Sequence, residues 1–375
     1  MSSVPTTCRA AAMVAPGAPL EVMEVQVPES LEPGAVLVRT TAATVCATDV
    51  HVWEGSVASK DVGSQFPVIL GHEMVGEVVR LGAGVDADSV GQSLREGDRI
   101  IWTHGFCGQC PSCTIENEPT LCSNRRGYMV TKCTNYPYLT GGFAEYCYVY
   151  PTSGRVRVPD SVPDDIASAS SCALRTVVHA FDRLGALDDR HHVVIQGSGP
   201  LGLFALSKAL TSGPARVTII GGPAKRLAVA ERWGATATID ITATSPDERR
   251  DTVMASTNGR GADVVIEMSG SPQAFAEGMG LLRSGGRYLI VGQVHGRSVP
   301  FNPSSIVLKH AQLIGTLSGS VAHYARGLEF IDHHRDRFRW SDMISNHYRL
   351  ENINDAFLGM QALTEIKPAI DFSAR

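Results

Sequence analysis

The sequence predicts a two-domain α/β protein in which a doubly wound parallel sheet interrupts an irregular, mostly β domain. Three observations predict this. The 375 residues are enough for two hydrophobic cores, short alternating apolar runs fill the first part of the chain, and a glycine-rich turn then opens a regular alternation of strands and helices. We expect residues 1–173 and 318–375 to form one domain and residues 174–317 the other.

The composition is ordinary, with 43% hydrophobic residues, 19% charged residues and a formal net charge of -5. This charge gives no reason to expect nucleic acid or an anionic membrane as a partner. The first residues lack the basic start and apolar run of a signal peptide, and no stretch of about eighteen apolar residues occurs. We therefore expect a cytoplasmic protein whose nine cysteines are metal ligands or free thiols rather than disulfides.

Short β-strands are expected first, because alternating apolar runs are separated by proline and glycine. They lie at about Arg9 to Pro28, Gly34 to Ala42, Val75 to Leu81 and Asp98 to Trp102. The long loops between these strands hold the reactive residues, as loops on a rigid scaffold often do. Trp53 and Trp102 lie near those loops in sequence and could wall a substrate cavity or belong to the core.

The first such loop offers a thiol, a hydroxyl, a carboxylate and an imidazole within six residues: Cys46, Thr48, Asp49 and His51. Gly71-His72-Glu73 follows about twenty residues later. Catalytic zinc takes three protein ligands and keeps one position open. Cys46 and His72 supply two such ligands and a third must follow, the alternative being a buried cysteine and a loop histidine without metal.

The second loop carries four cysteines in a C-x2-C-x2-C-x8-C array: Cys107, Cys110, Cys113 and Cys122. Four thiolates at this spacing are typical of a closed structural zinc site. The alternative is a C-x-x-C redox pair, which three evenly spaced cysteines and a fourth make less favourable. Cys133 and Cys147 compete with Cys122 as the fourth ligand.

The sequence pattern changes after Pro159. The segment from Val162 to Leu184 is alanine-rich and has apolar residues at helical spacing, which predicts a helix. Cys172 lies in this segment and is the natural third ligand for the metal held by Cys46 and His72. Taken alone, it would be a buried helix cysteine.

The nucleotide-binding segment begins with the apolar strand His192 to Gln196, followed by Gly197-Ser-Gly199-Pro-Leu-Gly202 and an apolar helix to about Leu210. These glycines let the backbone turn tightly and approach a pyrophosphate at the helix N-terminus. Strand and helix signals then alternate: Arg216 to Ile220, Ala224 to Trp233, Ala237 to Ile239, Ala262 to Met268, Ala274 to Leu282 and Arg287 to Val291. This alternation predicts a Rossmann sheet with a dinucleotide at the carboxyl ends of its strands.

Taken together, these motifs resemble the zinc-dependent medium-chain dehydrogenases of the alcohol and polyol type, over nearly the full chain. The resemblance rests on Cys46-x-Thr48-Asp49-x-His51, Gly71-His72-Glu73-x-x-Gly76, the four-cysteine loop, Cys172 with Thr176, and the glycines from Gly197. It implies that the first domain is a co-chaperonin-like (GroES-like) β-barrel completed by the C-terminal segment. It also implies a homodimer or homotetramer that associates near residues 287–317.

The same resemblance implies roles for individual residues. Cys46, His72 and Cys172 match the catalytic zinc ligands, Glu73 a carboxylate that can approach the metal, and Asp49 the carboxylate that orients the histidine. Thr48 and His51 match a proton relay from the alcohol to the surface. Leu201 and Thr176 would pack behind the nicotinamide, and Lys367 falls where the family places an arginine on the pyrophosphate.

The resemblance implies NAD or NADP as the coenzyme, and the turn after the second nucleotide strand slightly favours NADP. The acidic residue expected after the second nucleotide strand is missing, because Ile219-Ile220 leads into Gly221-Gly222-Pro223 with Lys225 and Arg226 following. A carboxylate there would repel a 2′-phosphate, whereas glycine and nearby cations would accept one.

The leading hypothesis is a zinc-dependent alcohol dehydrogenase with two zinc ions per chain, acting on a secondary or cyclic alcohol or reducing the matching ketone. One alternative is a zinc-independent quinone or enone reductase on the same fold. Another is a non-catalytic nucleotide-binding protein. The full ligand set weighs against the reductase, and the Thr48 and His51 pair weighs against the non-catalytic protein, since nucleotide binding needs neither residue.

Overall fold

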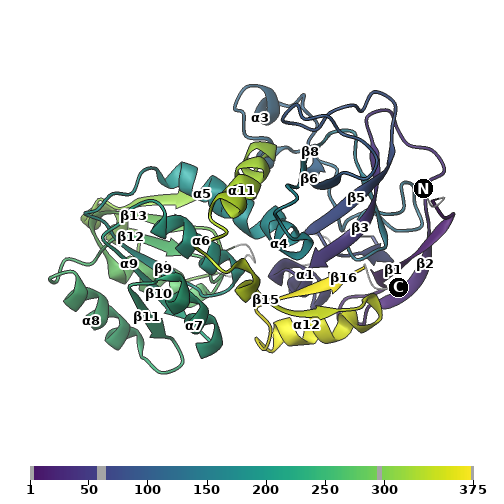
Figure 1. Cartoon of the computed structure of the whole chain (residues 1–375). Coiled ribbons are helices and arrows are strands. Elements are labelled where there is room, and N and C mark those ends of the chain that lie inside the picture. Colours follow the sequence, from purple (N-terminus) through teal and green to yellow (C-terminus); the bar gives the residue numbers. More distant parts are fainter. Residues whose placement is uncertain (1–3, 57–64, 294–297, 373–375) are drawn as a thin grey trace. The chain divides into compact units, whose positions relative to one another are not determined.

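The computed structural model describes residues 4–56, 65–293 and 298–372, which divide into two compact units (Figure 1). The first unit comprises residues 1–175, 319–335 and 343–375, and the second comprises residues 176–318 and 336–342. Both termini therefore belong to one unit, and the segment between them forms the other.

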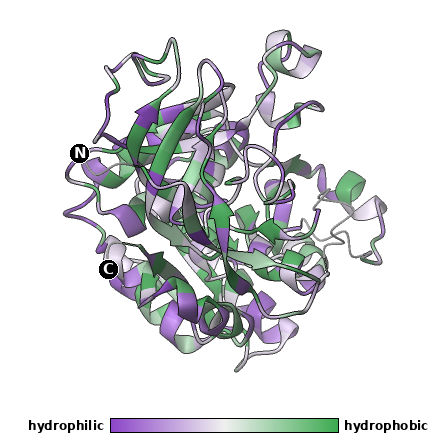
Figure 2. Cartoon of the chain, turned by 90° about the vertical axis from the view of Figure 1, so that its right-hand side faces the viewer, coloured by the Kyte–Doolittle hydropathy of each residue, from purple (hydrophilic) through white to green (hydrophobic). Residues whose placement is uncertain are grey.

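Within the described residues, ten strands form two sheets in the first unit: β1 (Thr7–Met13), β2 (Glu21–Gln26), β3 (Val36–Thr44), β4 (Val68–Ile69), β5 (Met74–Leu81), β6 (Arg99–Gly105), β7 (Tyr146–Val149), β8 (Ser153–Arg157), β15 (Ile344–Tyr348) and β16 (Lys367–Asp371). The smaller sheet has the order β2-β1-β4, and the larger has the order β15-β16-β3-β5-β6-β8 with β7 also paired to β3. Hydrophobic stretches run along several strands of this unit (Figure 2). Two of the strands, β3 and β7, are almost wholly buried.

The C-terminal strand completes the larger sheet. β16 pairs antiparallel with β3, so that Ala369 lies opposite Thr44 and Ile370 opposite Ala43. Helices of the first unit are α1 (Ala47–Trp53), α3 (Pro111–Thr114), α4 (Asp164–Ala169), α11 (Val321–His333) and α12 (Ile353–Gln361). Trp102 is 2% exposed and Trp53 packs edge-on against Phe357 at 5.7 Å between ring centroids. Trp102 therefore belongs to the core, and Trp53 is a partly buried residue that packs against it.

The second unit is built on six parallel strands: β9 (His192–Gln196), β10 (Arg216–Gly221), β11 (Ala237–Asp240), β12 (Ala262–Glu267), β13 (Leu282–Ile290) and β14 (Gln312–Gly315). Their order, β11-β10-β9-β12-β13-β14, is 3-2-1-4-5-6 when counted from β9, which is the order of a dinucleotide-binding Rossmann sheet. The helices of this unit are α5 (Arg175–Leu184), whose first residue still belongs to the first unit, α6 (Pro200–Leu210), α7 (Ala224–Trp233), α8 (Pro246–Ser256), α9 (Pro272–Leu281) and α10 (Ser304–Lys309). The predicted doubly wound sheet is confirmed.

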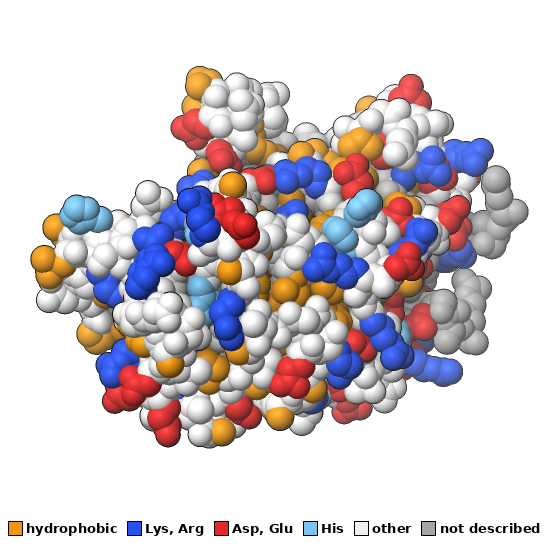
Figure 3. Space-filling view, turned by 60° about the vertical axis from the view of Figure 1, so that its left-hand side comes forward, with side chains coloured by type: hydrophobic (Ala, Val, Ile, Leu, Met, Phe, Trp, Pro, Cys, Tyr) orange, Lys and Arg blue, Asp and Glu red, His pale blue; other side chains and the backbone are white. Residues whose placement is uncertain are grey.

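Surface charge is mixed. Lysine and arginine side chains alternate with aspartate and glutamate over the face shown in Figure 3. None of the described helices is long and apolar enough to cross a membrane.

Candidate active site and metal centre

The loop after β3 delivers Cys46 to the site. Cys46 is the N-cap of α1 and has extended backbone angles. Its backbone N–H donates to Asp49 Oδ2 at 2.8 Å, the hydrogen bond of a capping box. This short helix therefore begins at the residue that carries the thiol, and the turn is held by the carboxylate three positions later.

Asp49 also anchors the loop that carries His72. Its Oδ1 accepts the Gly71 backbone N–H at 3.1 Å and lies 3.2 Å from His72 Nδ1. Gly71 has φ +92°, and a Cβ there would lie 3.0 Å from two backbone nitrogens, so only glycine fits. With Nδ1 facing Asp49, the ring presents Nε2 to the site.

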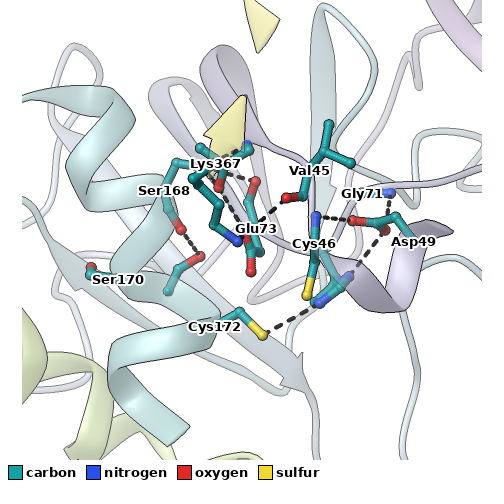
Figure 4. A network of polar contacts seen from close by, with 12 residues as sticks. Val45, Cys46, Asp49, Gly71, Glu73, Ser168, Ser170, Cys172 and Lys367 are labelled. Atoms are coloured by element: carbon teal, nitrogen blue, oxygen red, sulfur yellow. Dashed lines mark hydrogen bonds and ion pairs between the residues drawn. The ribbon is translucent and has the colours of Figure 1, made fainter. Parts of the chain in front are cut away.

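Cys172 completes the group from a π-helical turn, Ser170–Leu174, between α4 and α5. Its Sγ lies 3.4 Å from His72 Nε2 (Figure 4). One ligand atom from each of Cys46, His72, Glu73 and Cys172 falls within 4.8 Å of all the others. The structure therefore brings the three predicted catalytic ligands and Glu73 together within the first unit.

Glu73 is fully buried and held at one oxygen only (Figure 4). Its Oε2 accepts the Thr44 hydroxyl at 2.6 Å and forms an ion pair with Lys367 Nζ. The Ser168 hydroxyl lies 3.0 Å from Thr44 Oγ1 and supports this arrangement. Glu73 Oε1 has no hydrogen-bond partner among the described residues, although a buried carboxylate oxygen normally has one.

The donor atoms of the site fit a divalent metal ion. Two thiols, an imidazole and a carboxylate each bring one ligand atom into the same small volume. This is a donor set that zinc prefers, and cysteines bind metals as thiolates. Arg175 and Lys367 are buried cations whose charges act on the Cys172 thiol.

Burial and neighbouring groups shift the pKa values of Cys46, Cys172 and Glu73. The Cys172 thiol and burial raise the pKa of Cys46 to about 11, while the hydrogen bond from Cys46 lowers the pKa of Cys172. Burial raises the pKa of Glu73 to about 7, against the opposing effect of the Lys367 ammonium.

The second cysteine cluster is equally compact. The four sulfurs of Cys107, Cys110, Cys113 and Cys122 lie within 4.8 Å of one another. The backbone N–H groups of Gln109 and Cys110 donate to Cys107 Sγ at 3.5 and 3.4 Å and lower its pKa to about 6. Cys133 and Cys147 are buried elsewhere and are not part of the cluster.

The predicted relay residues lie on one side of α1. Thr48 and His51 are three positions apart, the spacing that makes helix residues neighbours. Both are half-buried, and His51 Nδ1 lies 3.9 Å from Glu54 Oε2. Their role in proton transfer stays a prediction.

The glycine-rich turn of the second unit has the geometry of a phosphate-binding loop. Gly197 has φ +111°, and a Cβ on Gly202 would lie 1.8 Å from Gly197 O. Gly199 is the N-cap of α6, whose first turn contains Leu201, and Thr176 is buried at the start of α5. Glycine is therefore required at two of the predicted coenzyme positions.

The end of β10 explains the missing acidic residue. A Cβ on Gly221 would lie 2.3 Å from Ser198 Oγ, so no side chain fits there. A Cβ on Gly222 would meet nothing closer than Ile241 at 3.4 Å and would lie 3.7 Å from Asp240 Oδ1. Arg226 is buried nearby, with one guanidinium nitrogen 3.7 Å from the Cβ position of Gly199.

The chain matches the description of an alcohol dehydrogenase GroES-like domain over residues 32–160 and of a zinc-binding dehydrogenase over residues 200–333. It is 32% identical over 341 residues to 5-exo-hydroxycamphor dehydrogenase of Pseudomonas putida, covering 90% of this chain and 92% of the relative. The chain belongs to the zinc-dependent medium-chain alcohol dehydrogenase family. A sorbitol dehydrogenase of Halalkalibacterium halodurans is 30% identical to this chain, and the match covers 88% of this chain and 90% of the relative.

Solved structures agree with this membership. An alcohol dehydrogenase of Thermotoga maritima is 32% identical and has a TM-score of 0.90, covering 97% of this chain and 99% of the other. A zinc-binding dehydrogenase of Sinorhizobium meliloti is 27% identical with a TM-score of 0.81, covering 98% and 100%. The expected GroES-like and Rossmann domains are thereby confirmed.

The sequence did not predict the contacts that four residues make at this site. Thr44 and Ser168 bind Glu73 or its backbone, Lys367 pairs with Glu73, and Arg175 lies beside the π-helical turn. Lys367 is 2% exposed, and its assignment to the pyrophosphate stays a prediction. A threonine or serine in a buried strand or helix carries no pattern that distinguishes it from a core residue.

Proposed function

We propose that this dehydrogenase is zinc-dependent and transfers a hydride between a secondary or cyclic alcohol, or its ketone, and NADP or NAD. The observation that carries the proposal is the convergence of Cys46, His72 and Cys172 around a point that Glu73 also faces. Zinc bound there would lower the pKa of an alcohol by several units and polarise a ketone in the reverse direction.

The chain's own residues then hold the metal site and move the proton. Asp49 keeps the His72 ring oriented through the 3.2 Å contact at Nδ1. Thr48 would accept the alcohol proton while giving up its own hydroxyl proton, which the half-buried His51 would take and release towards solvent. Histidine suits this last step because its ordinary pKa is near neutral.

The substrate class is supported by the relatives. Their names specify 5-exo-hydroxycamphor, L-threonine at position 3 and sorbitol, and the first of these, a cyclic alcohol, is named by a relative that spans nearly the whole chain. We therefore place cyclic secondary alcohols first, ahead of amino-acid and polyol substrates.

A substrate panel tests the proposal. Bicyclic secondary alcohols, L-threonine, sorbitol, a primary alcohol and an enone are each assayed with both coenzymes, before and after zinc removal by a chelator. We expect the cyclic alcohols to give the highest kcat/KM and zinc removal to abolish it. Turnover of the enone alone, unaffected by zinc removal, would instead identify a zinc-independent reductase.

NADP is the proposed coenzyme. Gly221 excludes the carboxylate that would repel a 2′-phosphate, Arg226 offers a cation beside the glycine-rich turn, and the Sinorhizobium meliloti relative was solved bound to NADP. Fluorescence titration with NADPH and NADH tests this: we expect at least tenfold tighter binding of NADPH, about 1.4 kcal/mol. Equal dissociation constants would contradict it.

We also propose two zinc ions per chain, a cytoplasmic location and a homodimer or homotetramer. The nine cysteines form no disulfide within the described residues, an arrangement that suits a reducing compartment. The predicted association region, 287–317, includes residues 294–297, which lie outside the described residues. Within its described part, Val307 and Leu308 are 71% and 79% exposed near the edge strand β14. Light scattering of the parent and of Leu308→Asp tests association, which the variant should weaken.

A further inference from the structure

The π-helical turn at Ser170–Leu174 leaves one carbonyl outside the normal helix pattern. π-turns are rare in proteins and occur often at functional sites. The backbone N–H groups that end this turn donate to Ser170 O and Cys172 O, and thereby skip the carbonyl of Ser171 between them. Ser171 precedes the metal ligand Cys172, so its orientation affects the thiol directly.

The side chain of Arg175 takes the place of the missing backbone donor. Its Nε donates to Ser171 O at 3.0 Å. In a regular α-helix this carbonyl would accept the backbone N–H of residue 175. The arginine therefore closes the turn in its π form, and a residue without a donor at that position would leave a buried carbonyl unsatisfied.

The segment that begins at Gly319 packs against Arg175 and holds its side chain in place. The arginine is 4% exposed, and its guanidinium carbon lies 5.4 Å from the centroid of the Tyr324 ring. A Cβ on Gly319 would approach Arg175 O to 3.0 Å and Arg175 Cδ to 3.2 Å. All of these residues belong to the first unit.

The charge of Arg175 faces the metal site. Burial opposes that charge, but attraction from Tyr324, Cys172 and Glu73 raises the pKa of the guanidinium. Lys367 is already engaged by Glu73. Arg175 and Lys367 are therefore both buried cations whose charges act on Cys172.

We propose that Arg175 is a positioning residue for the metal centre, which closes the π-helical turn at Ser171 and so fixes the direction of the Cys172 thiolate towards the metal. The inference rests on the proposed zinc site. It goes beyond the ligand set, because it states that Arg175, which is not a metal ligand, strengthens metal binding by holding the Cys172 turn in place.

The test is the rate at which the zinc-loaded full-length protein releases zinc to an excess of a chromophoric chelator. Cys46→Ser and Cys110→Ser identify which phase of release belongs to which site. We expect Arg175→Met to accelerate the Cys46 phase by about 10- to 100-fold, the usual effect of losing a partner of a metal ligand, and to leave the other phase unchanged.

Arg155→Met is the matched control, since Arg155 is also a buried arginine of the first unit and bonds a backbone carbonyl, Pro151 O, at 3.2 Å. It should change neither phase. Arg175→Lys keeps the charge without the Nε donor and serves if the methionine variant does not fold; it should also accelerate the Cys46 phase. In cobalt-loaded protein, the Arg175 variants should alter the thiolate charge-transfer bands that Cys46→Ser removes.

Folded Arg175 variants that release zinc at the parent's rate and keep its cobalt spectrum would overturn the inference while leaving the zinc site intact. A parent protein whose zinc content equals that of Cys46→Ser would instead show that the proposed metal site is wrong. The two failures are therefore distinguishable.

Discussion

A single carboxylate, Asp49, joins the two loops that carry the first two metal ligands. It accepts backbone N–H groups from Cys46 and Gly71 and contacts His72 Nδ1. Because three interactions converge on one fully buried side chain, the loops cannot move independently. The thiol and the imidazole are therefore held in position before any metal binds.

Thr44→Val tests the hydroxyl that holds Glu73. The change removes the 2.6 Å hydrogen bond to Glu73 Oε2 and leaves a buried carboxylate with fewer donors, which should lower the free energy of unfolding by about 1–3 kcal/mol. Thr40→Val is the matched control on the same strand, because the buried Thr40 hydroxyl has no hydrogen-bond partner among the described residues. It should be neutral or stabilising in urea denaturation. Equal losses in both variants would contradict the assignment.

His104 should make the protein less stable in mild acid. Burial, followed by the charges of Arg175 and His72, holds the pKa of His104 well below its ordinary value of 6.5. Below pH 6.5 the unfolded chain binds a proton that the folded chain does not, so stability falls as the pH is lowered, by up to about 1.4 kcal/mol per pH unit. Above pH 6.5 this contribution is constant.

His104→Asn should flatten this dependence. The asparagine oxygen can accept the Tyr128 backbone N–H that now donates to His104 Nδ1 at 3.2 Å, and it does not titrate. Unfolding free energies measured from pH 5 to pH 7.5 should show a smaller slope below pH 6.5 in the variant. Identical slopes would show that His104 protonates equally in both states.

Among the secondary-structure elements, the four-cysteine loop contains little regular structure. It contains only the four-residue helix α3 and a 3-10 turn at Pro119–Leu121. Such a segment buries little apolar surface and depends on cross-linking for its order. We therefore expect the cluster of four sulfurs to stabilise the loop rather than to act on substrate.

Cys110→Ser should accordingly lower the melting temperature more than it lowers turnover per folded molecule. The change removes one of four thiolates from a closed site, while Cys46, His72 and Cys172 stay unchanged. Calorimetry and active-site titration measure the two quantities. A variant that melts like the parent but has lost all turnover would show that the two clusters have exchanged roles.

The turn after β10 allows a direct test of coenzyme choice. A Cβ on Gly222 would make only ordinary van der Waals contacts, 3.4 Å or longer, so Gly222→Asp should fit and its carboxylate should repel a 2′-phosphate. We expect the dissociation constant of NADPH to rise at least tenfold, about 1.4 kcal/mol, with little change for NADH. Gly222→Asn has nearly the same shape without the charge and should bind NADPH as the parent does. Equal effects of both variants on NADPH would point to steric interference instead.

For the whole molecule, the sequence was sufficient to predict both domains and the two cysteine clusters. Glycines whose Cβ would clash, cysteines at metal-ligand spacing and strand-helix alternation each leave a local pattern. The π-helical turn and the contacts of Thr44, Ser168, Arg175 and Lys367 could not be predicted in this way. They depend on segments as distant in sequence as Glu73 and Lys367, and their residue types are equally common in ordinary cores and surfaces.

The two units divide the predicted work of the enzyme. The metal cluster lies wholly within the first unit, and the glycine-rich turn lies wholly within the second. Damage confined to the metal cluster should therefore abolish chemistry without abolishing coenzyme binding.

Cys46→Ser tests this central claim most directly, through zinc content, coenzyme affinity and turnover measured on the same preparation. Cys133→Ser is the control, since Cys133 is a buried free thiol outside both clusters. We predict that Cys46→Ser loses one zinc ion per chain and essentially all alcohol oxidation while binding NADPH as the parent does. Full turnover in Cys46→Ser protein would contradict the metal-dependent mechanism.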